Sequence, residues 1–176
     1  MGARERFQQQ KAWADSHLNE VNRVIRQLVG KIIDIQPTDP GRDRRYGIDY
    51  EVKVVGGSVA CRIRRADRYN FRDLTITTRR PSGVTPEVTK ILDGSVRWYL
   101  YAWASQGKFI DWMFVDLDKV RALRLIENSI EQGRTFPDPE GGVFTCIPFE
   151  ELRDSGALVQ YQMSQRRTAN RHEEAG

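Results

Sequence analysis

The sequence predicts an α/β fold in which helices flank a central mixed β-sheet within a single domain, residues 1–163. Apolar residues recur at spacings of three and four between Leu18 and Val29, which is typical of an amphipathic helix. Aromatic and β-branched residues dominate 96–104 and 109–115, which is typical of central strands. Helical and strand patterns are mixed along the chain without an internal repeat or a domain boundary, and this favours one mixed-sheet domain.

The first helix is expected to begin near Ser16 and to end before Gly30. Serine is a favoured N-cap, and glycine is favoured just after a helix ends. A short strand is expected at 32–35. The following segment, 36–47, is rich in proline, glycine and arginine, so it is expected to form a loop that displays its arginines.

Residues 46–65 are predicted to form a β-hairpin. Two alternating runs flank Gly56-Gly57, and both glycines can adopt the positive φ of a primed turn. One face of this hairpin is then apolar: Ile48, Tyr50, Val52, Val54, Val59, Cys61 and Ile63. The other face carries the charges: Asp49, Glu51, Lys53, Arg62 and Arg64. In this register Asp49 faces Arg64 and Glu51 faces Arg62.

The rest of the chain adds further elements with local start and stop signals. A third strand is expected at 74–79, and a helix is expected to begin at Thr85-Pro86-Glu87. A second hairpin is predicted to turn at 105–108. Its aromatic residues are expected to pack in the core rather than form a platform for bases. The later elements are a helix capped by Asp116 or Asp118 and ending at Gly133, a strand at 143–147, a helical turn at 148–152 and a strand at 157–163. The polar tail 164–176 is expected to be disordered.

The basic charge of the chain is unevenly distributed. The net charge is +4 over 176 residues, yet residues 42–80 hold eleven Lys and Arg against five Asp and Glu. A clustered basic surface predicts a polyanionic partner, and a solvated, salt-bridged sheet face is the alternative. No apolar run is long enough to span a bilayer, and no secretion signal is evident, so we expect a cytoplasmic protein without membrane contact. Both cysteines, Cys61 and Cys146, are expected to be buried and reduced.

The residue types present narrow the chemistry of a possible active site. The only histidines are His17 and His172, and neither has partners at metal-ligand spacing. The chain contains no nucleophile elbow and no glycine-rich phosphate loop. The remaining option is carboxylate and basic side chains that hold Mg²⁺ against a phosphodiester. The sequence leaves open whether the protein is an enzyme.

The predicted order of elements over residues 16–115 resembles the PD-(D/E)XK, or restriction-endonuclease-like, nuclease superfamily. This resemblance implies an α-β-β-β-α-β core, with a metal-binding Asp on one strand and an acid-x-Lys motif on the next. The segment GIDYEV matches the first motif, with Asp49 as the metal ligand. The second motif departs from the pattern, because Ala60-Cys61-Arg62 stands at its position. Arginine can clamp a phosphate but cannot act as a base.

Two interpretations of this departure follow. In the first, the site has migrated: Glu87 and Lys90 lie three residues apart on the next helix and supply the second acid and the lysine, with Glu20 assisting. Glu87 and Asp49 would then bind Mg²⁺. The alternative for Glu87 is a first-turn acid that stabilises the helix dipole and pairs with Lys90. In the second interpretation the catalytic site is lost and the fold only binds.

We therefore expect a nucleic-acid-associated protein of nuclease-like fold, with DNA favoured over RNA as its partner, although the sequence does not decide between them. Its phosphate contacts are expected from the arginines of the loop and the hairpin: Arg42, Arg44, Arg45, Arg62, Arg64 and Arg65. Mg²⁺-dependent phosphodiester hydrolysis would use Asp49, Glu87 and Lys90. The competing expectation is a non-catalytic interaction or assembly module with an acidic partner. The oligomeric state does not follow from the sequence.

Overall fold

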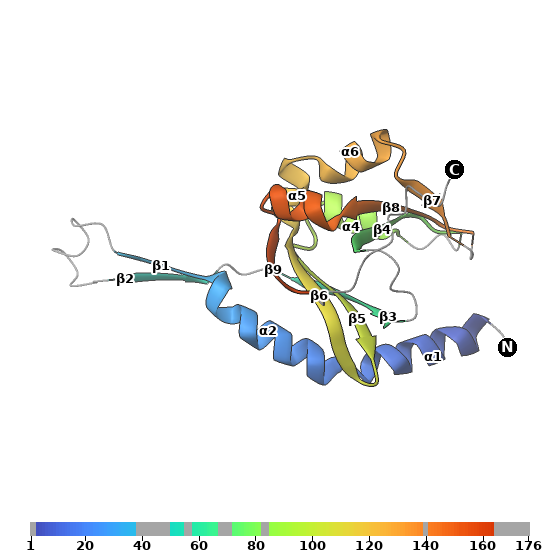
Figure 1. Cartoon of the computed structure of the whole chain (residues 1–176), viewed down its shortest axis with the longest axis horizontal. Coiled ribbons are helices and arrows are strands. Elements are labelled where there is room, and N and C mark those ends of the chain that lie inside the picture. The colour runs from blue at the N-terminus through green and yellow to red at the C-terminus, as the bar shows by residue number, and fades with distance from the viewer. Residues whose placement is uncertain are drawn as a thin grey trace. The chain divides into compact units, whose positions relative to one another are not determined.

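The computed structural model describes residues 3–37, 50–54, 58–66, 72–81, 85–138 and 141–163. For residues 29–37 and 50–54 the description is limited to the backbone. The chain divides into two compact units, Met1–Gly57 and Ser58–Gly176. The expected single domain stays a prediction. Figure 1 shows the helices and strands.

The described part of the first unit contains two helices and a two-stranded ribbon. Its elements in chain order are α1 (Ala3–Asp15), α2 (Leu18–Ile32), β1 (Ile33–Pro37) and β2 (Tyr50–Val54). The amphipathic helix predicted near residues 16–29 is confirmed as α2, whose apolar residues Val21, Val24 and Leu28 are buried. The helix continues through Gly30 to Ile32, so the predicted end before Gly30 is wrong. Helix α1 was not predicted, because its polar sequence lacks the apolar spacing of a helix.

The hairpin predicted over residues 46–65 is wrong. Strand β2 pairs antiparallel with β1, whereas β3 (Val59–Arg65) pairs parallel with β5 (Trp98–Ser105). A Gly-Gly pair permits a tight turn but does not require one, and the long apolar strand β5 offers β3 a different partner. The expected pairing of Glu51 with Arg62 across a β2–β3 hairpin is therefore not formed. Gly56, Gly57 and Asp49 lie outside the described residues.

Within the described residues, the second unit contains two sheets and four short helices. A mixed four-stranded sheet has the order β3-β5-β6-β9, with β6 at Lys108–Asp116 and β9 at Leu158–Gln162. An antiparallel sheet has the order β4-β8-β7, formed by Asp73–Arg79, Val143–Pro148 and Thr135–Pro137. The helices are α4 (Glu87–Leu92), α5 (Leu117–Ala122), α6 (Leu125–Glu131) and α7 (Phe149–Asp154). The α/β class with a mixed sheet is thus confirmed.

The restriction-endonuclease-like core stays a prediction. Strands β2, β3 and β4 belong to three separate sheets, so direct pairing does not join them into one three-stranded unit. The strand expected at 74–79 is present as β4, but its partner is β8 rather than β3.

The core of the second unit lies between its two sheets. Leu74 and Ile76 of β4 meet Tyr101 of β5 and Met113 of β6 within one cluster, which α5 and α6 extend with Leu117 and Ile126. The predicted hairpin at 105–108 is confirmed, and it turns at Gln106 and Gly107, both with positive φ. The expectation that its aromatic residues pack in the core is also confirmed, because Trp98, Tyr99, Trp103 and Phe114 are buried.

Two helix predictions need correction. Helix α4 begins at Glu87 with Pro86 as its N-cap, so Thr85 supplies no side-chain cap. Asp116 does cap α5, through hydrogen bonds from the backbone N–H groups of Asp118 and Lys119. The single helix expected up to Gly133 is instead two, because Arg124 adopts a left-handed conformation between α5 and α6.

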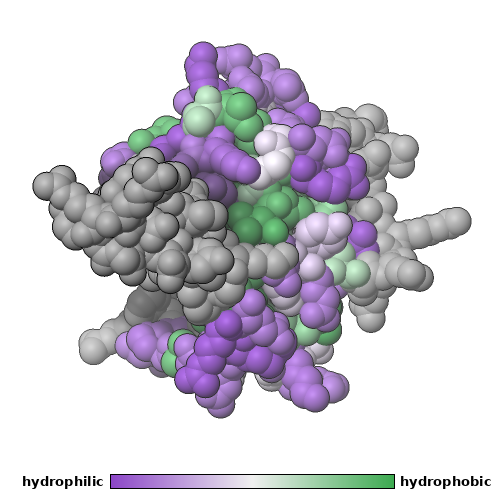
Figure 2. Space-filling model, turned by 90° about the vertical axis from the view of Figure 1, so that its left-hand side faces the viewer, coloured by the Kyte–Doolittle hydropathy of each residue, from purple (hydrophilic) through white to green (hydrophobic). Residues whose placement is uncertain are grey.

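Polar residues predominate on one face of the molecule. On the face drawn in Figure 2, hydrophilic residues predominate and hydrophobic ones occupy smaller areas. Large exposed apolar side chains occur singly on different elements of the described chain: Leu18, Val59, Leu92, Leu123, Ile130 and Tyr161. Within the described residues, no helix has the length and apolar character needed to cross a membrane.

Candidate functional site

Four of the predicted site residues lie outside the described part of the chain. These are the metal-ligand candidate Asp49 and the phosphate-contact candidates Arg42, Arg44 and Arg45. The remaining candidates lie on two elements of the second unit. Arg62, Arg64 and Arg65 are on β3, and Glu87 and Lys90 are on α4.

Strand β3 presents its charged residues differently from the prediction. Ala60, Arg62 and Arg64 alternate onto one face and are half-buried, whereas Val59 and Cys61 on the other face are exposed. The expectation that Cys61 is buried in an apolar face is therefore wrong, although Cys146 is buried and both thiols are free. Polar partners on neighbouring elements explain why the arginine face can turn inward.

Those partners form a cluster around the carboxylate of Glu87, which we call the Glu87 cluster (Arg62, Thr75, Thr77, Glu87 and Tyr99). Arg62 Nη1 donates to Glu87 Oε2 at 2.6 Å and to the Thr75 carbonyl at 3.3 Å. The Thr77 backbone N–H donates to the same carboxylate oxygen at 3.0 Å, and the Tyr99 hydroxyl donates to Glu87 Oε1 at 2.6 Å. The cluster thereby joins α4, β3, β4 and β5.

The electrostatics of this cluster favour the ionised carboxylate. Burial raises the pKa of Glu87, but the Arg62 guanidinium and the hydrogen bonds from Tyr99 and Thr77 outweigh it, so the pKa lies below its ordinary value. Burial and the neighbouring Glu87 charge raise the pKa of Tyr99 well above its ordinary value. Glu87 is therefore a carboxylate and Tyr99 a neutral donor at neutral pH.

One interpretation of the sequence paired Glu87 with Lys90, but in the structure Glu87 forms an ion pair with Arg62. The ion pair of Glu87 in the structure joins it to Arg62, and both side chains are about three-quarters buried, with 22% and 26% exposed. Lys90 is exposed one turn further along α4. The sequence singled out Glu87 and Arg62 separately but did not link them, and it did not single out Tyr99 or Thr77, because these partners come from three other elements.

Arg64 occupies the next inward-facing position of β3. Its guanidinium carbon lies 5.6 Å from the centre of the Tyr101 ring, within the range of a cation–π contact. Its Nε atom is buried without a hydrogen-bond partner among the described residues. Arg65 points to the opposite face of the strand and is exposed.

A metal site does not follow from the described residues alone. Within them, no group of three or more His, Cys, Asp or Glu side chains is placed to hold a metal ion. Both oxygens of Glu87 already accept hydrogen bonds from protein donors. Whether Glu87 and Asp49 could share Mg²⁺ stays a prediction, since Asp49 lies outside the described chain.

Two exposed arginines were missed as candidates. Arg79 ends β4, Arg80 follows it, and Lys90 is on α4, which packs on β4 through the Thr77–Glu87 hydrogen bond. We call these three residues the basic edge. Within the described residues none of them has an ion pair, whereas exposed Arg23, Arg124 and Arg153 pair with acids nearby in sequence. The doubled arginine at the end of LTITTRR was the sequence signal for this feature.

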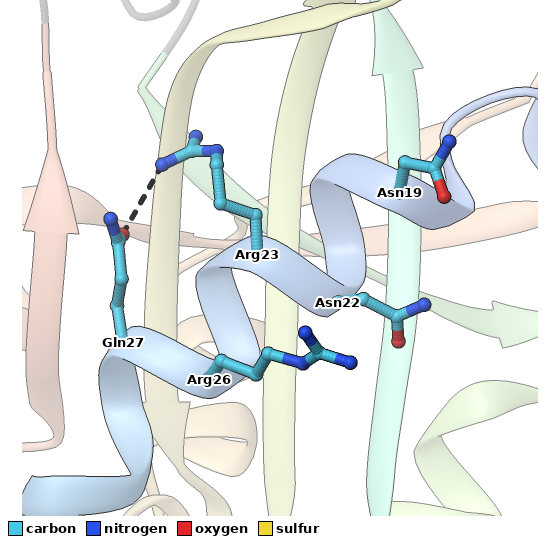
Figure 3. Close-up of a pocket in the computed structure, with 5 residues that line it drawn as sticks. All are labelled: Asn19, Asn22, Arg23, Arg26 and Gln27. Carbon is cyan, nitrogen blue, oxygen red and sulfur yellow. Dashed lines mark hydrogen bonds between the residues drawn. The ribbon is translucent and has the colours of Figure 1, made fainter.

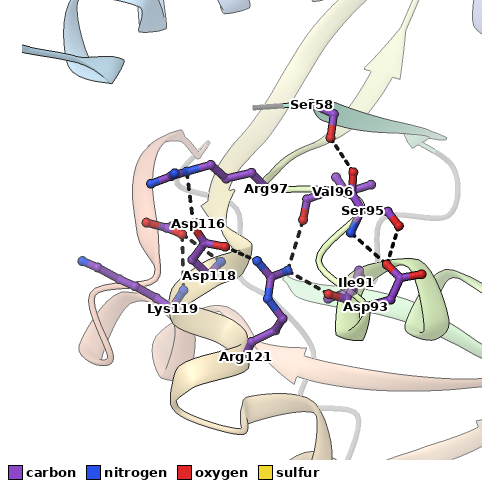
Figure 4. A network of polar contacts seen from close by, with 10 residues as sticks. All are labelled: Ser58, Ile91, Asp93, Ser95, Val96, Arg97, Asp116, Asp118, Lys119 and Arg121. Atoms are coloured by element: carbon purple, nitrogen blue, oxygen red, sulfur yellow. Dashed lines mark hydrogen bonds and ion pairs between the residues drawn. The ribbon is translucent and has the colours of Figure 1, made fainter. Parts of the chain in front are cut away.

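A second polar network, centred on Arg121, connects α4, α5 and the segment before β5 (Figure 4). Arg121 of α5 donates to the carbonyls of Ile91 at 2.7 Å and Val96 at 3.1 Å, and it pairs with Asp118. Asp118 also pairs with Arg97 at 3.3 Å. These contacts satisfy the end of α4 and fix the segment that leads into β5, so they hold the frame around the Glu87 cluster.

No family model, curated protein or solved structure matches this chain.

Proposed function

We propose that this protein binds the phosphate backbone of nucleic acid through the basic edge of its second unit. The observation that carries this proposal is the exposure of Arg79, Arg80 and Lys90 on two packed elements, without ion pairs among the described residues. Unpaired surface cations attract a polyanion, and neutralised phosphates release counterions, which favours binding. Arg65 on the neighbouring sheet is a further exposed contact.

Composition supports the same partner. Residues 42–80 carry the excess of basic charge, whereas 81–160 hold eight Lys and Arg against twelve Asp and Glu. Arg79 and Arg80 of the basic edge belong to this basic segment, and the acidic segment 81–160, which also holds Lys90, would disfavour indiscriminate contact with a polyanion. We place the protein in the cytoplasm, in keeping with its two free cysteines.

We further propose that binding occurs without cleavage at Glu87. Arg62, Tyr99 and the Thr77 N–H already occupy three of the about four lone-pair positions of this carboxylate, so to ligate Mg²⁺ through both oxygens it would have to release at least one of them. Hydrogen bonds to a charged group contribute about 1.5–3 kcal/mol each, so this release would be costly. The Glu87 cluster then holds α4 against β3. This role fits the interpretation of a nuclease-like fold that has lost its catalytic site.

The test is a comparison of two charge-reversed variants by fluorescence anisotropy with labelled duplex DNA at low salt. R79E/R80E should weaken binding at least about tenfold, because a carboxylate that repels phosphate then stands where each arginine would bind one. The matched control R124E/R153E changes the net charge by the same amount on other elements, and it should weaken binding less than about threefold.

Several results would contradict the proposal. Equal loss of affinity in both variants would show that net charge, and not the basic edge, governs binding. Absence of binding to any nucleic acid at low salt would instead favour an interaction module with an acidic protein partner. Cleavage of DNA with Mg²⁺ or Mn²⁺ that disappears in E87Q would overturn the structural role of Glu87.

A further inference from the structure

Helix α2 has two opposite faces of very different chemistry. Val21, Val24 and Leu28 form its buried stripe, with 8%, 0% and 1% exposed. The other face lines an open hollow of about 480 Å³ with five polar side chains: Asn19, Asn22, Arg23, Arg26 and Gln27 (Figure 3). At 3.6 residues per turn these five positions span an arc of about 140° whose centre is opposite the buried stripe. The polar face is therefore available along the helix while the apolar face is used for packing.

The side chains on this face are those that read base edges in duplex DNA. Arginine forms paired hydrogen bonds with the O6 and N7 atoms of guanine, and asparagine or glutamine forms them with the N6 and N7 atoms of adenine. All five lining residues belong to these three types. A face that served solubility alone would more commonly be rich in lysine and glutamate.

Several of these side chains have unused hydrogen-bonding capacity. Arg23 pairs with Glu20 at 2.8 Å and donates to Gln27 at 3.3 Å. Among the described residues, Arg26 has no ion pair, and the amides of Asn19 and Asn22 have no side-chain hydrogen bond. Glu20, the one acid beside this face, is already paired with Arg23, so the face keeps a positive charge that complements a polyanion.

We infer that α2 is a recognition helix that enters the major groove of duplex DNA, with Asn22 and Arg26 as its central base contacts. The inference rests on the proposed function and adds a substrate class, since the basic edge by itself would bind any phosphate backbone. The fifteen residues of α2 form a helix about 22 Å long, and the major groove of B-form DNA is wide enough to admit an α-helix. Sequence preference would then come from the first unit and most of the affinity from phosphate contacts.

The experiment selects preferred sequences with the full chain from a pool of DNA duplexes with a randomised centre. Anisotropy then compares the enriched duplex with a shuffled duplex of equal composition. N22A/R26A should weaken binding to the enriched duplex by about 5- to 150-fold for each base that is no longer bound, and binding to the shuffled duplex by less than about threefold. N19A/Q27A serves as a second variant of the same face. Circular dichroism checks that both variants keep their helix content.

Two controls separate base reading from general charge. N128A/R153A removes one asparagine and one arginine from the second unit, and it should leave the preference unchanged. R79E/R80E should weaken binding to both duplexes by the same factor. An RNA duplex of the enriched sequence should be bound no better than a shuffled RNA duplex, because the deep, narrow major groove of A-form RNA excludes a helix.

The outcomes distinguish this inference from the proposed function. If the wild-type protein binds DNA without selecting any sequence, the recognition helix is refuted and backbone binding stands. If both variants of α2 retain the full preference, or if the preference extends to duplex RNA, the inference is again refuted. If no nucleic acid is bound at low salt, both proposals fail together.

Discussion

At the scale of single residues, the Glu87–Arg62 pair is the contact with the clearest energetic consequence. The carboxylate receives three protein hydrogen bonds, and both members of the pair are largely buried. E87Q keeps the shape and two acceptor positions of the side chain but leaves the Arg62 charge without its counter-charge. We expect the free energy of unfolding at pH 7 to fall by about 1–3 kcal/mol, measured by urea denaturation. Exposed Glu150 on α7 is the control, and E150Q should change stability by less than about 0.5 kcal/mol.

The pH dependence of this difference follows from the lowered pKa of Glu87. Because the folded-state pKa lies below the ordinary value of 4.5, the stabilisation is complete above that value and is lost as the pH falls through the folded-state pKa. The gap in unfolding free energy between the wild-type protein and E87Q should therefore be constant from pH 7 to about 5 and narrow at lower pH. A gap that stays constant down to pH 3 would show that the charge of Glu87 is not what stabilises the fold.

At the scale of elements, Arg121 joins three segments that are separate in the sequence. Its guanidinium donates hydrogen bonds to the carbonyls of Ile91 at the end of α4 and Val96 before β5, and it forms an ion pair with Asp118 of α5. We expect R121M to lower the free energy of unfolding by about 2–3 kcal/mol, because two carbonyls lose a charged donor and the segment before β5 is released. Hydrogen exchange should become faster at Val96 to Trp98.

The control for this prediction is another arginine of the same region. Arg124 is 66% exposed, and its ion pairs with Glu127 and Glu131 are long, at 4.0 and 3.9 Å. R124M should therefore cost less than about 1 kcal/mol in unfolding free energy. Equal costs for R121M and R124M would mean that the Arg121 network adds little to the fold.

At the scale of the whole molecule, the proposed backbone binding predicts a specific response to salt. The logarithm of the DNA affinity should fall linearly with the logarithm of the salt concentration, by about 0.9 per phosphate contact on duplex DNA. R79A/R80A should therefore reduce the magnitude of this slope by about 1.8, as measured by anisotropy titrations across a salt series. R124A/R153A should leave the slope unchanged, and a slope unaltered by R79A/R80A would exclude these two arginines as phosphate contacts.

Local sequence signals predicted much of the fold. The aromatic strands, the hairpin at 105–108, the Asp116 cap and the amphipathic helix α2 were all predictable, because each depends on residues a few positions apart. The α/β class followed from those elements. The break between α5 and α6 was not predictable, because it depends on one arginine that adopts a left-handed conformation for which its residue type shows no preference.

The candidate site was only partly predictable. Glu87 was identified from the sequence as a potential second acid, but its bond to Arg62 spans 25 positions, and Tyr99 and Thr77 were not linked to it. Arg62 was expected on a solvent-facing hairpin and is instead half-buried beside β4 and β5. An alternating strand pattern defines two faces, but it does not say which face will find partners.

The sequence by itself determined where most strands and helices form, which residues share a face and where basic charge accumulates. Tertiary structure alone decided that β3 pairs with β5 rather than β2, and that Glu87 pairs with Arg62 rather than Lys90. The reason is physical. Periodicity, caps and turns are encoded within neighbouring residues, whereas strand partners and ion pairs depend on which distant surfaces offer buried area and unsatisfied hydrogen bonds.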